Sequence, residues 1–136
     1  MTHFTIGKNV TLSVSGNCDP CYRFALTELK RLLGRLGISA TETTCYFADQ
    51  CIIGLDTSAE ISADEVCYDG FILDISDPSA ILCATTPKGI LNGVYELAER
   101  LGITFLYPGE AGEWLPEQIK QPETGHFVLN PYFPYR

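Results

Sequence analysis

Apolar residues recur every three or four positions in two stretches of the chain, and this spacing predicts two amphipathic helices. The first covers about residues 20–36, and the second begins at Pro87 and continues to about residue 101. Each stretch opens on a proline preceded by a residue that can cap a helix, Asp19 in the first and Thr86 in the second. The starts of both helices can therefore be read directly from the sequence.

The letters Arg-Leu-Gly-Ile stand at the end of both predicted helices, at residues 35–38 and 100–103. Gly37 and Gly102 can adopt the left-handed backbone conformation that stops a helix. The isoleucine that follows each glycine opens a run suited to a strand. The sequence thus predicts a sheet strand directly after each helix.

Short apolar or alternating runs predict the strands of the sheet. They cover residues 4–14 with a break at 7–9, then 38–44, 51–55, 71–75, 81–84 and 103–107, with a polar loop over 56–64. Each helix stands between two such runs, which predicts two βαβ units with parallel strands. We expect an α/β (α+β) sandwich: a mixed sheet of about five to seven strands with two main helices packed on one face.

Charge and composition exclude several classes of partner. Nine basic residues stand against seventeen acidic ones, so the net charge of −8 disfavours nucleic acid and anionic membrane surfaces. The one basic cluster, Lys30, Arg31 and Arg35, is interpreted as the solvated face of the first helix. The sequence shows no membrane-spanning run and no secretion signal, which predicts a cytoplasmic location unless a leader was removed from a secreted parent.

Cys18 and Cys21 form a C-x-P-C sequence between a predicted strand and a helix start. A helix N-terminus lowers the pKa of a thiol, so one hypothesis is a small thiol-disulfide oxidoreductase with Cys18 attacking and Cys21 resolving. Thioredoxin-like proteins also carry a cis-proline before a later strand, whereas Pro87 precedes a helix. One C-x-x-C without a second pair does not predict a zinc site, and no cofactor or metal is expected.

Four weak motifs follow one another along the chain in an order that resembles a known group of proteins. They are Y-D-G-F-I-L at residues 68–73, T-P-K-G at 86–89 leading into G-V-Y-E-L-A-E-R-L-G, P-G-E with W-L-P at 108–116, and N-P-Y-F-P-Y-R at 130–136. This order resembles the small domain that precedes the catalytic barrel in bacterial glycoside hydrolases. The relatives are β-N-acetylhexosaminidases of family 20, α-glucuronidases, α-N-acetylglucosaminidases and uncharacterised proteins of similar architecture.

The resemblance implies a single accessory domain over residues 1–130, with residues 131–136 starting a strap to a catalytic barrel. In such proteins the catalytic carboxylates belong to the barrel, so this chain is expected to be non-catalytic. Its expected partner is the barrel of the same polypeptide, with an oligosaccharide possible at the domain edge. This step from fold to function is an analogy.

Glu110 and Glu113 are the acidic residues that most invite a catalytic interpretation. Glycosidases use two carboxyl groups held about 5–9.5 Å apart, and these two glutamates stand close together after a Pro-Gly turn. We interpret them as parts of a solvated loop instead, because the resemblance assigns the chemistry to the barrel. As members of the 107–116 loop, both are also candidates for contact with the barrel or its substrate.

Trp114 is the stronger candidate for a contact residue, since an indole can stack on a sugar ring or anchor an interface. Three interpretations stay open: packing within its own domain, docking against the barrel, and sugar contact. The last includes a stand-alone carbohydrate-binding module built around Trp114. The aromatic residues Tyr132, Phe133 and Tyr135 are similarly expected to form a surface that another domain covers.

Overall fold

The computed structural model describes residues 8–14, 19–43, 52–56, 70–76, 79–106 and 110–129. The helices are α1 (Pro20–Arg35) and α2 (Pro87–Arg100), with a short 3-10 turn η1 (Glu110–Gly112). The strands are β1 (Asn9–Val14), β2 (Ser39–Thr43), β3 (Ile52–Asp56), β4 (Phe71–Ser76), β5 (Ser79–Cys83), β6 (Thr104–Phe105), β7 (Glu113–Trp114) and β8 (Gly125–Leu129). Within these residues, no helix combines the length and the apolar character needed to cross a membrane.

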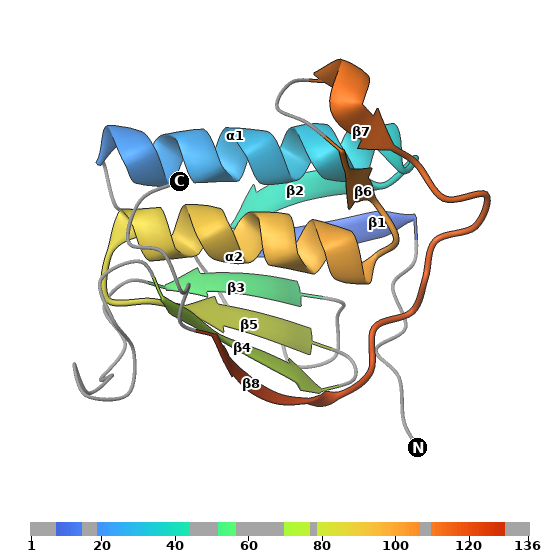
Figure 1. Cartoon of the computed structure of the whole chain (residues 1–136). Helices are drawn as coiled ribbons and strands as arrows, with labels where there is room; N and C mark the ends of the chain where they lie inside the picture. The colour runs from blue at the N-terminus through green and yellow to red at the C-terminus, as the bar shows by residue number, and fades with distance from the viewer. Residues whose placement is uncertain are drawn as a thin grey trace.

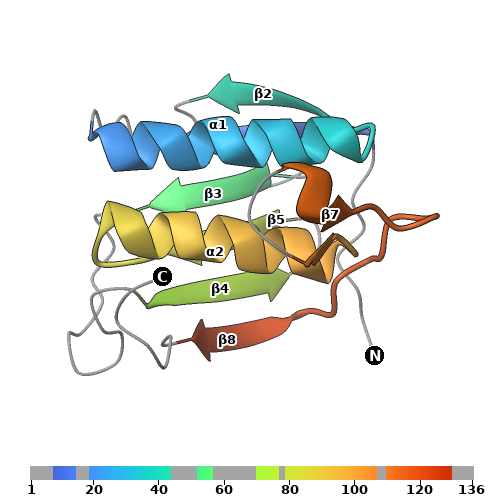
Figure 2. The same cartoon turned by 45° about the horizontal axis from the view of Figure 1, so that its top comes forward.

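Six of the strands form one mixed sheet in the order β2-β1-β3-β5-β4-β8. Strands β2, β1, β3 and β5 pair in parallel, and β4 pairs antiparallel with both β5 and β8. Helices α1 and α2 lie side by side across one face of this sheet (Figures 1 and 2). The predicted two-layer sandwich with a mixed sheet is confirmed.

Both helices begin where the sequence places their caps. The Asp19 carboxylate accepts a hydrogen bond of 2.8 Å from the backbone N–H of Cys21, and the Thr86 hydroxyl accepts one of 3.2 Å from Gly89. Each bond satisfies a backbone donor that the first turn of a helix leaves open.

Both helices also end in the same hydrogen-bonded motif. The N–H of Ile38 donates to the carbonyl of Leu33 at 2.9 Å, and the N–H of Ile103 donates to the carbonyl of Ala98 at 3.1 Å. Gly37 and Gly102 have φ angles of +80° and +112°, as the Schellman motif requires. The repeated Arg-Leu-Gly-Ile sequence is therefore the same helix stop used twice.

The strands that follow the two helices pair differently. After α1 the chain enters β2, which pairs in parallel with β1, so the first predicted βαβ unit is confirmed. After α2 the chain enters β6, which pairs antiparallel with β7 in a separate two-stranded ribbon. The second predicted βαβ unit is wrong, because β6 does not join the sheet that contains β5, whose two neighbours are β3 and β4.

The last strand of the sheet, β8, was not among the predicted strands. It follows a polar stretch and is only five residues long, yet it pairs with β4 over its whole length. Phe127 stands opposite buried Leu73 on the helix side, and His126 stands opposite exposed Asp74 on the other side. The short apolar run Phe127-Val128-Leu129 is the signal that could have identified the strand.

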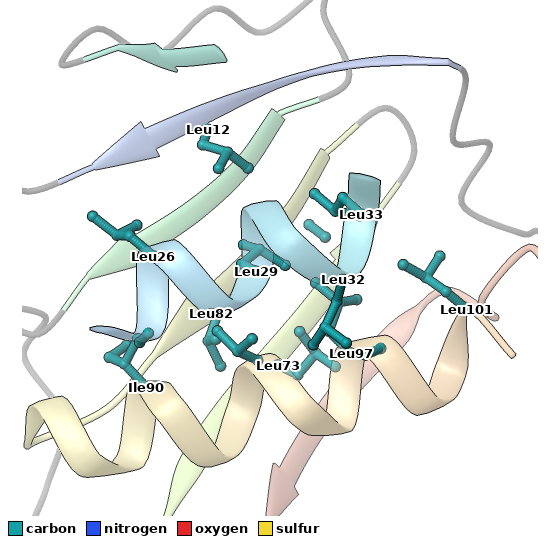
Figure 3. Packing of buried hydrophobic residues seen from close by; sticks show 14 of the residues in the cluster. Leu12, Leu26, Leu29, Leu32, Leu33, Leu73, Leu82, Ile90, Leu97 and Leu101 are labelled. Carbon is teal, nitrogen blue, oxygen red and sulfur yellow. The ribbon is translucent and has the colours of Figure 1, made fainter. Parts of the chain in front are cut away.

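The hydrophobic core lies between the helices and the sheet (Figure 3). In β4, Phe71, Leu73 and Ile75 point into it and are buried, and on the other face Asp74 and Ser76 are exposed while Ile72 is buried. The helices contribute their apolar stripes, with Tyr22, Ala25, Leu26, Leu29, Leu32 and Leu33 from α1 and Ile90, Val94, Leu97 and Ala98 from α2.

Two glycines let α2 approach the sheet closely. A Cβ atom at Gly89 would overlap the backbone carbonyl of Gly70 and stand 2.7 Å from the Cβ of Ala84. A Cβ at Gly93 would collide with the side chain of Leu82 in β5. Because a backbone carbonyl moves less readily than a side-chain end, Gly89 is the more constrained of the two.

We expect Gly89→Ala to lower the free energy of unfolding, despite the better helix propensity of alanine, because the new methyl group displaces α2 from the sheet. Overpacking of this kind costs about 1–3 kcal/mol. The matched control is Gly34→Ala in α1, where nothing lies within 4 Å of the added Cβ. That control should stabilise by up to about 1 kcal/mol. Urea unfolding of both variants measures the difference, and equal effects would contradict the close approach at Gly89.

Candidate functional site

The β6–β7 ribbon is the part of the molecule where candidate functional residues gather. Thr104 pairs with Trp114 and Phe105 pairs with Glu113, and the N–H of Leu106 donates to the carbonyl of Gly112 at 2.8 Å. The ribbon lies over the C-terminal parts of α1 and α2, on the side of the helices away from the sheet (Figure 2). It is a third layer that the sequence-based prediction lacked.

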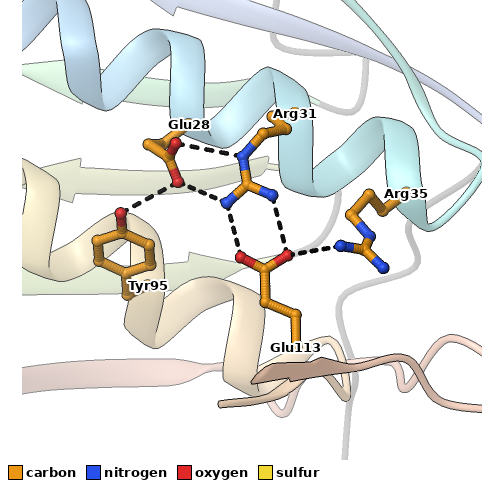
Figure 4. A network of polar contacts seen from close by, with 5 residues as sticks. All are labelled: Glu28, Arg31, Arg35, Tyr95 and Glu113. Atoms are coloured by element: carbon orange, nitrogen blue, oxygen red, sulfur yellow. Dashed lines mark hydrogen bonds and ion pairs between the residues drawn. The ribbon is translucent and has the colours of Figure 1, made fainter. Parts of the chain in front are cut away.

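Glu113 attaches this ribbon to α1 (Figure 4). Its two carboxylate oxygens accept hydrogen bonds of 2.9 and 2.7 Å from the two terminal nitrogens of Arg31, and Arg35 donates a third of 3.1 Å. The Glu113 side chain is only 5% exposed. The prediction of a solvated loop is therefore wrong for Glu113. The interpretation of the basic cluster as a purely solvated helix face is also wrong, because Arg31 and Arg35 turn toward this carboxylate.

The same network continues to α2 through Glu28 and Tyr95. Arg31 donates to both oxygens of Glu28, at 3.2 and 2.7 Å, and the Tyr95 hydroxyl donates to Glu28 at 3.0 Å. Burial, followed by the charge of Glu28, raises the pKa of Tyr95 to about 12. Tyr95 also packs edge to face against Phe105 of β6, with ring centroids 5.6 Å apart. Side chains from α1, α2 and both ribbon strands thus meet in one cluster.

Hydrogen bonds from Arg31 lower the pKa of Glu113 below its ordinary value, and its burial opposes this shift only in part. The hydrogen bond to Glu113 in turn raises the pKa of Arg31. A general acid in glycoside hydrolysis needs the opposite, a carboxyl whose pKa is raised so that it keeps its proton. The environment of Glu113 is therefore that of a structural ion pair.

Trp114 points away from this cluster, on the opposite side of the ribbon. It is 64% exposed, and its neighbours on the same side, Thr104 and Leu106, are exposed as well. The indole is therefore not buried in its own domain, which removes the first of its three interpretations. Glu110 opens the η1 turn, and its interpretation as part of a solvated loop stays a prediction.

Several other candidates lie outside the described residues. These are Cys18 and the aromatic residues Tyr132, Phe133 and Tyr135 of the expected strap. Cys21 is described, at the start of α1, and burial, followed by the charge of Asp19, raises the pKa of its thiol. The lowered thiol pKa expected at this helix start is not found at Cys21. Nowhere in the described ranges do three or more His, Cys, Asp or Glu side chains gather as metal ligands.

Searches by sequence found no relative: no protein-family model matches the chain, and no curated protein matches it. Solved structures do share its fold. A chitobiase of family GH20 from Flavobacterium johnsoniae has a TM-score of 0.64 at 20% identity, over 100% of this chain and 20% of the enzyme. A GH20 exo-β-N-acetylglucosaminidase from Vibrio harveyi gives 0.62 at 15% identity, over 100% of this chain and 18% of the enzyme.

A third solved structure comes from another glycoside hydrolase family. It is a GH115 4-O-methyl-α-glucuronidase described as specific for decorated arabinogalactans, with a TM-score of 0.60 at 18% identity. The match covers 93% of this chain and 18% of the enzyme. The chain thus spans about a fifth of the length of each of these three proteins, and it has the fold of one part of them.

We expect Glu113→Gln to lower the free energy of unfolding by about 1–3 kcal/mol at neutral pH, since it removes a buried charge that accepts three hydrogen bonds. Because the folded-state pKa of Glu113 is lowered, this stabilisation is complete above the unfolded pKa of about 4.3. It is lost as the pH falls through the lower folded value. The difference between wild type and variant should therefore shrink below about pH 4.

Urea unfolding at a series of pH values measures this difference. The control is Glu117→Gln, four residues further along the chain, which changes an exposed glutamate and should alter stability by less than about 0.5 kcal/mol. Equal effects of the two substitutions, or a difference that does not change with pH, would contradict the role given to Glu113.

Proposed function

We propose that this chain is a non-catalytic accessory domain of a larger glycoside hydrolase, and that it packs against the catalytic barrel of the same polypeptide. The observation that carries the proposal is the unequal coverage of the structural matches. They span 93–100% of this chain but only 18–20% of the three glycoside hydrolases described above. A fold that recurs as a minor part of enzymes from two different families fits a supporting domain better than the site of the reaction.

The electrostatics of Glu113 and Glu28 support a non-catalytic role. Glu113, the buried acidic residue of the ribbon, is engaged by Arg31 and Arg35 and is held ionised. Glu28 is likewise engaged by Arg31 and Tyr95. Carboxylates that are fully occupied by partners within their own domain are poorly placed to transfer a proton to a glycosidic oxygen. Chemistry in a longer protein would fall to residues outside this domain.

We expect the native protein to be a polypeptide that continues into a barrel of about 250 residues with paired carboxylates at its strand ends. The 136-residue chain should release no 4-nitrophenol from a panel of 4-nitrophenyl glycosides, whereas the native protein should hydrolyse at least one. Measured hydrolysis by the 136-residue chain itself, or a native protein without a glycosidase domain, would contradict the proposal.

A carbohydrate-binding module is the second candidate, because Trp114 is 64% exposed. It is the one tryptophan of the chain, so its fluorescence reports on that position alone. Stacking of a sugar on the indole would shift or quench this emission. Under the accessory-domain proposal, N-acetylglucosamine oligosaccharides and arabinogalactan fragments should leave the emission of the 136-residue chain unchanged. A saturable change with either sugar would favour the second candidate.

A further inference from the structure

One side of the β6–β7 ribbon is apolar and exposed, and nothing described in the structure covers it. Thr104, Leu106 and Trp114 share this side, and Leu115 follows directly; we call these four residues the outer face of the ribbon. Leu106 is 57% exposed, Trp114 64% and Leu115 42%. Of the five large apolar side chains that are exposed in the described part of the chain, three belong to this small area.

The outer face is held in place from behind. Phe105 and Glu113 point the opposite way, where they contact Tyr95 and the two arginines of α1. A further hydrogen bond of 2.9 Å, from the N–H of Lys120 to the carbonyl of Leu101, attaches the segment that leaves the ribbon to the end of α2. A surface that is already ordered loses little entropy when a partner binds, which favours recognition.

The residue types of the outer face favour a protein surface as its partner. Tryptophan is enriched among the residues that carry most of the energy of protein–protein interfaces. A sugar site needs several convergent polar groups around the aromatic platform, whereas the described residues beside Trp114 on this side of the ribbon are Thr104 and Leu106, and exposed Leu115 comes next in the chain. The outer face therefore fits an apolar protein surface better than a glycan.

The small size of the outer face favours a partner in the same polypeptide. Its exposed apolar area is on the order of a few hundred Å², whereas a stable complex between separate molecules buries roughly 800 Å² per partner in total, somewhat more than half of it apolar. A contact within one polypeptide can be smaller, because the linkage supplies an effective concentration in the millimolar range. A second copy of this chain, or a free partner, would gain too little from this surface alone.

We propose that the outer face of the β6–β7 ribbon is the contact surface for the catalytic domain of the same polypeptide, and that the Glu113 network is what positions it. This inference rests on the proposed function and assigns the interface to one face of the domain. The domain docks through Leu106, Trp114 and Leu115. Glu113 acts as a positioning residue, because it contacts α1 rather than the partner.

Hydroxyl-radical footprinting with residue-level mass spectrometry tests this assignment on the native polypeptide and on the 136-residue chain in parallel. Labelling of Trp114 and Leu106 should fall at least fivefold in the native polypeptide. The internal control is His126, which is exposed on the sheet face away from the helices and should be labelled equally in both. Equal labelling of Trp114 in both proteins would overturn the assignment.

The same experiment separates this inference from the proposed function. A native polypeptide that contains an active glycosidase domain but leaves Trp114 fully labelled refutes the docking surface alone. Absence of such a domain refutes both. Protection in the 136-residue chain that grows with protein concentration, or that needs added oligosaccharide, would also overturn the assignment, since the occupant would then be a second copy or a glycan.

The variants Trp114→Ala and Glu113→Gln test positioning in the native polypeptide. Trp114→Ala removes a largely exposed side chain, so the urea midpoint of the 136-residue chain should not change. In the native polypeptide it should restore labelling of Leu106. Glu113→Gln should raise labelling of Leu106 while circular dichroism shows that the domain is still folded. Unchanged protection of Leu106 in both variants would refute the roles given to the indole and to the Glu113 network.

Discussion

The position of β5 inside the sheet is the constraint on which the rest of the structure depends. Its parallel partner β3 and its antiparallel partner β4 use both of its edges. The chain leaves α2 through a helix stop that matches the end of α1, but it finds no free strand edge beside β5. Backbone hydrogen-bonding groups need partners, and residues 104–105 find theirs in residues 113–114, outside the sheet. The ribbon over the helices is the result.

Once the ribbon lies over α1 and α2, the chemistry of its two sides follows from strand alternation. One side carries Phe105 and Glu113 toward the helices, and the other carries Leu106 and Trp114 toward solvent. A carboxylate that loses contact with water needs compensating charge and hydrogen bonds. Arg31 and Arg35, one helical turn apart on α1, supply both. The side that anchors the ribbon and the exposed side that we propose as a contact surface are therefore set by the same alternation.

The comparison with glycoside hydrolases gives this arrangement a context. Domains of this fold make up about a fifth of the GH20 and GH115 enzymes, and sequence identity is at most 20%. At that identity the fold is shared while individual contacts need not be. The function we propose needs a stable core and a surface that a neighbouring domain covers, and neither requires a catalytic group. The carboxylates of the Glu113 network stabilise the ribbon, and the exposed indole is the surface residue on which the proposal rests.

The sequence by itself determined the parts of this protein that depend on local chemistry. Capping by Asp19 and Thr86, the glycine stops and the apolar stripes of both helices could all be predicted, because each depends on residues a few positions apart. The two-layer class followed from the order of these elements. Strand β8 was missed because its apolar run is only three residues long and follows a polar stretch. Only the tertiary structure decided that residues 104–105 leave the sheet and that Glu113 meets Arg31, 82 positions earlier in the chain. Such pairings depend on which strand edges and charged groups the rest of the fold leaves available, and no local pattern encodes that.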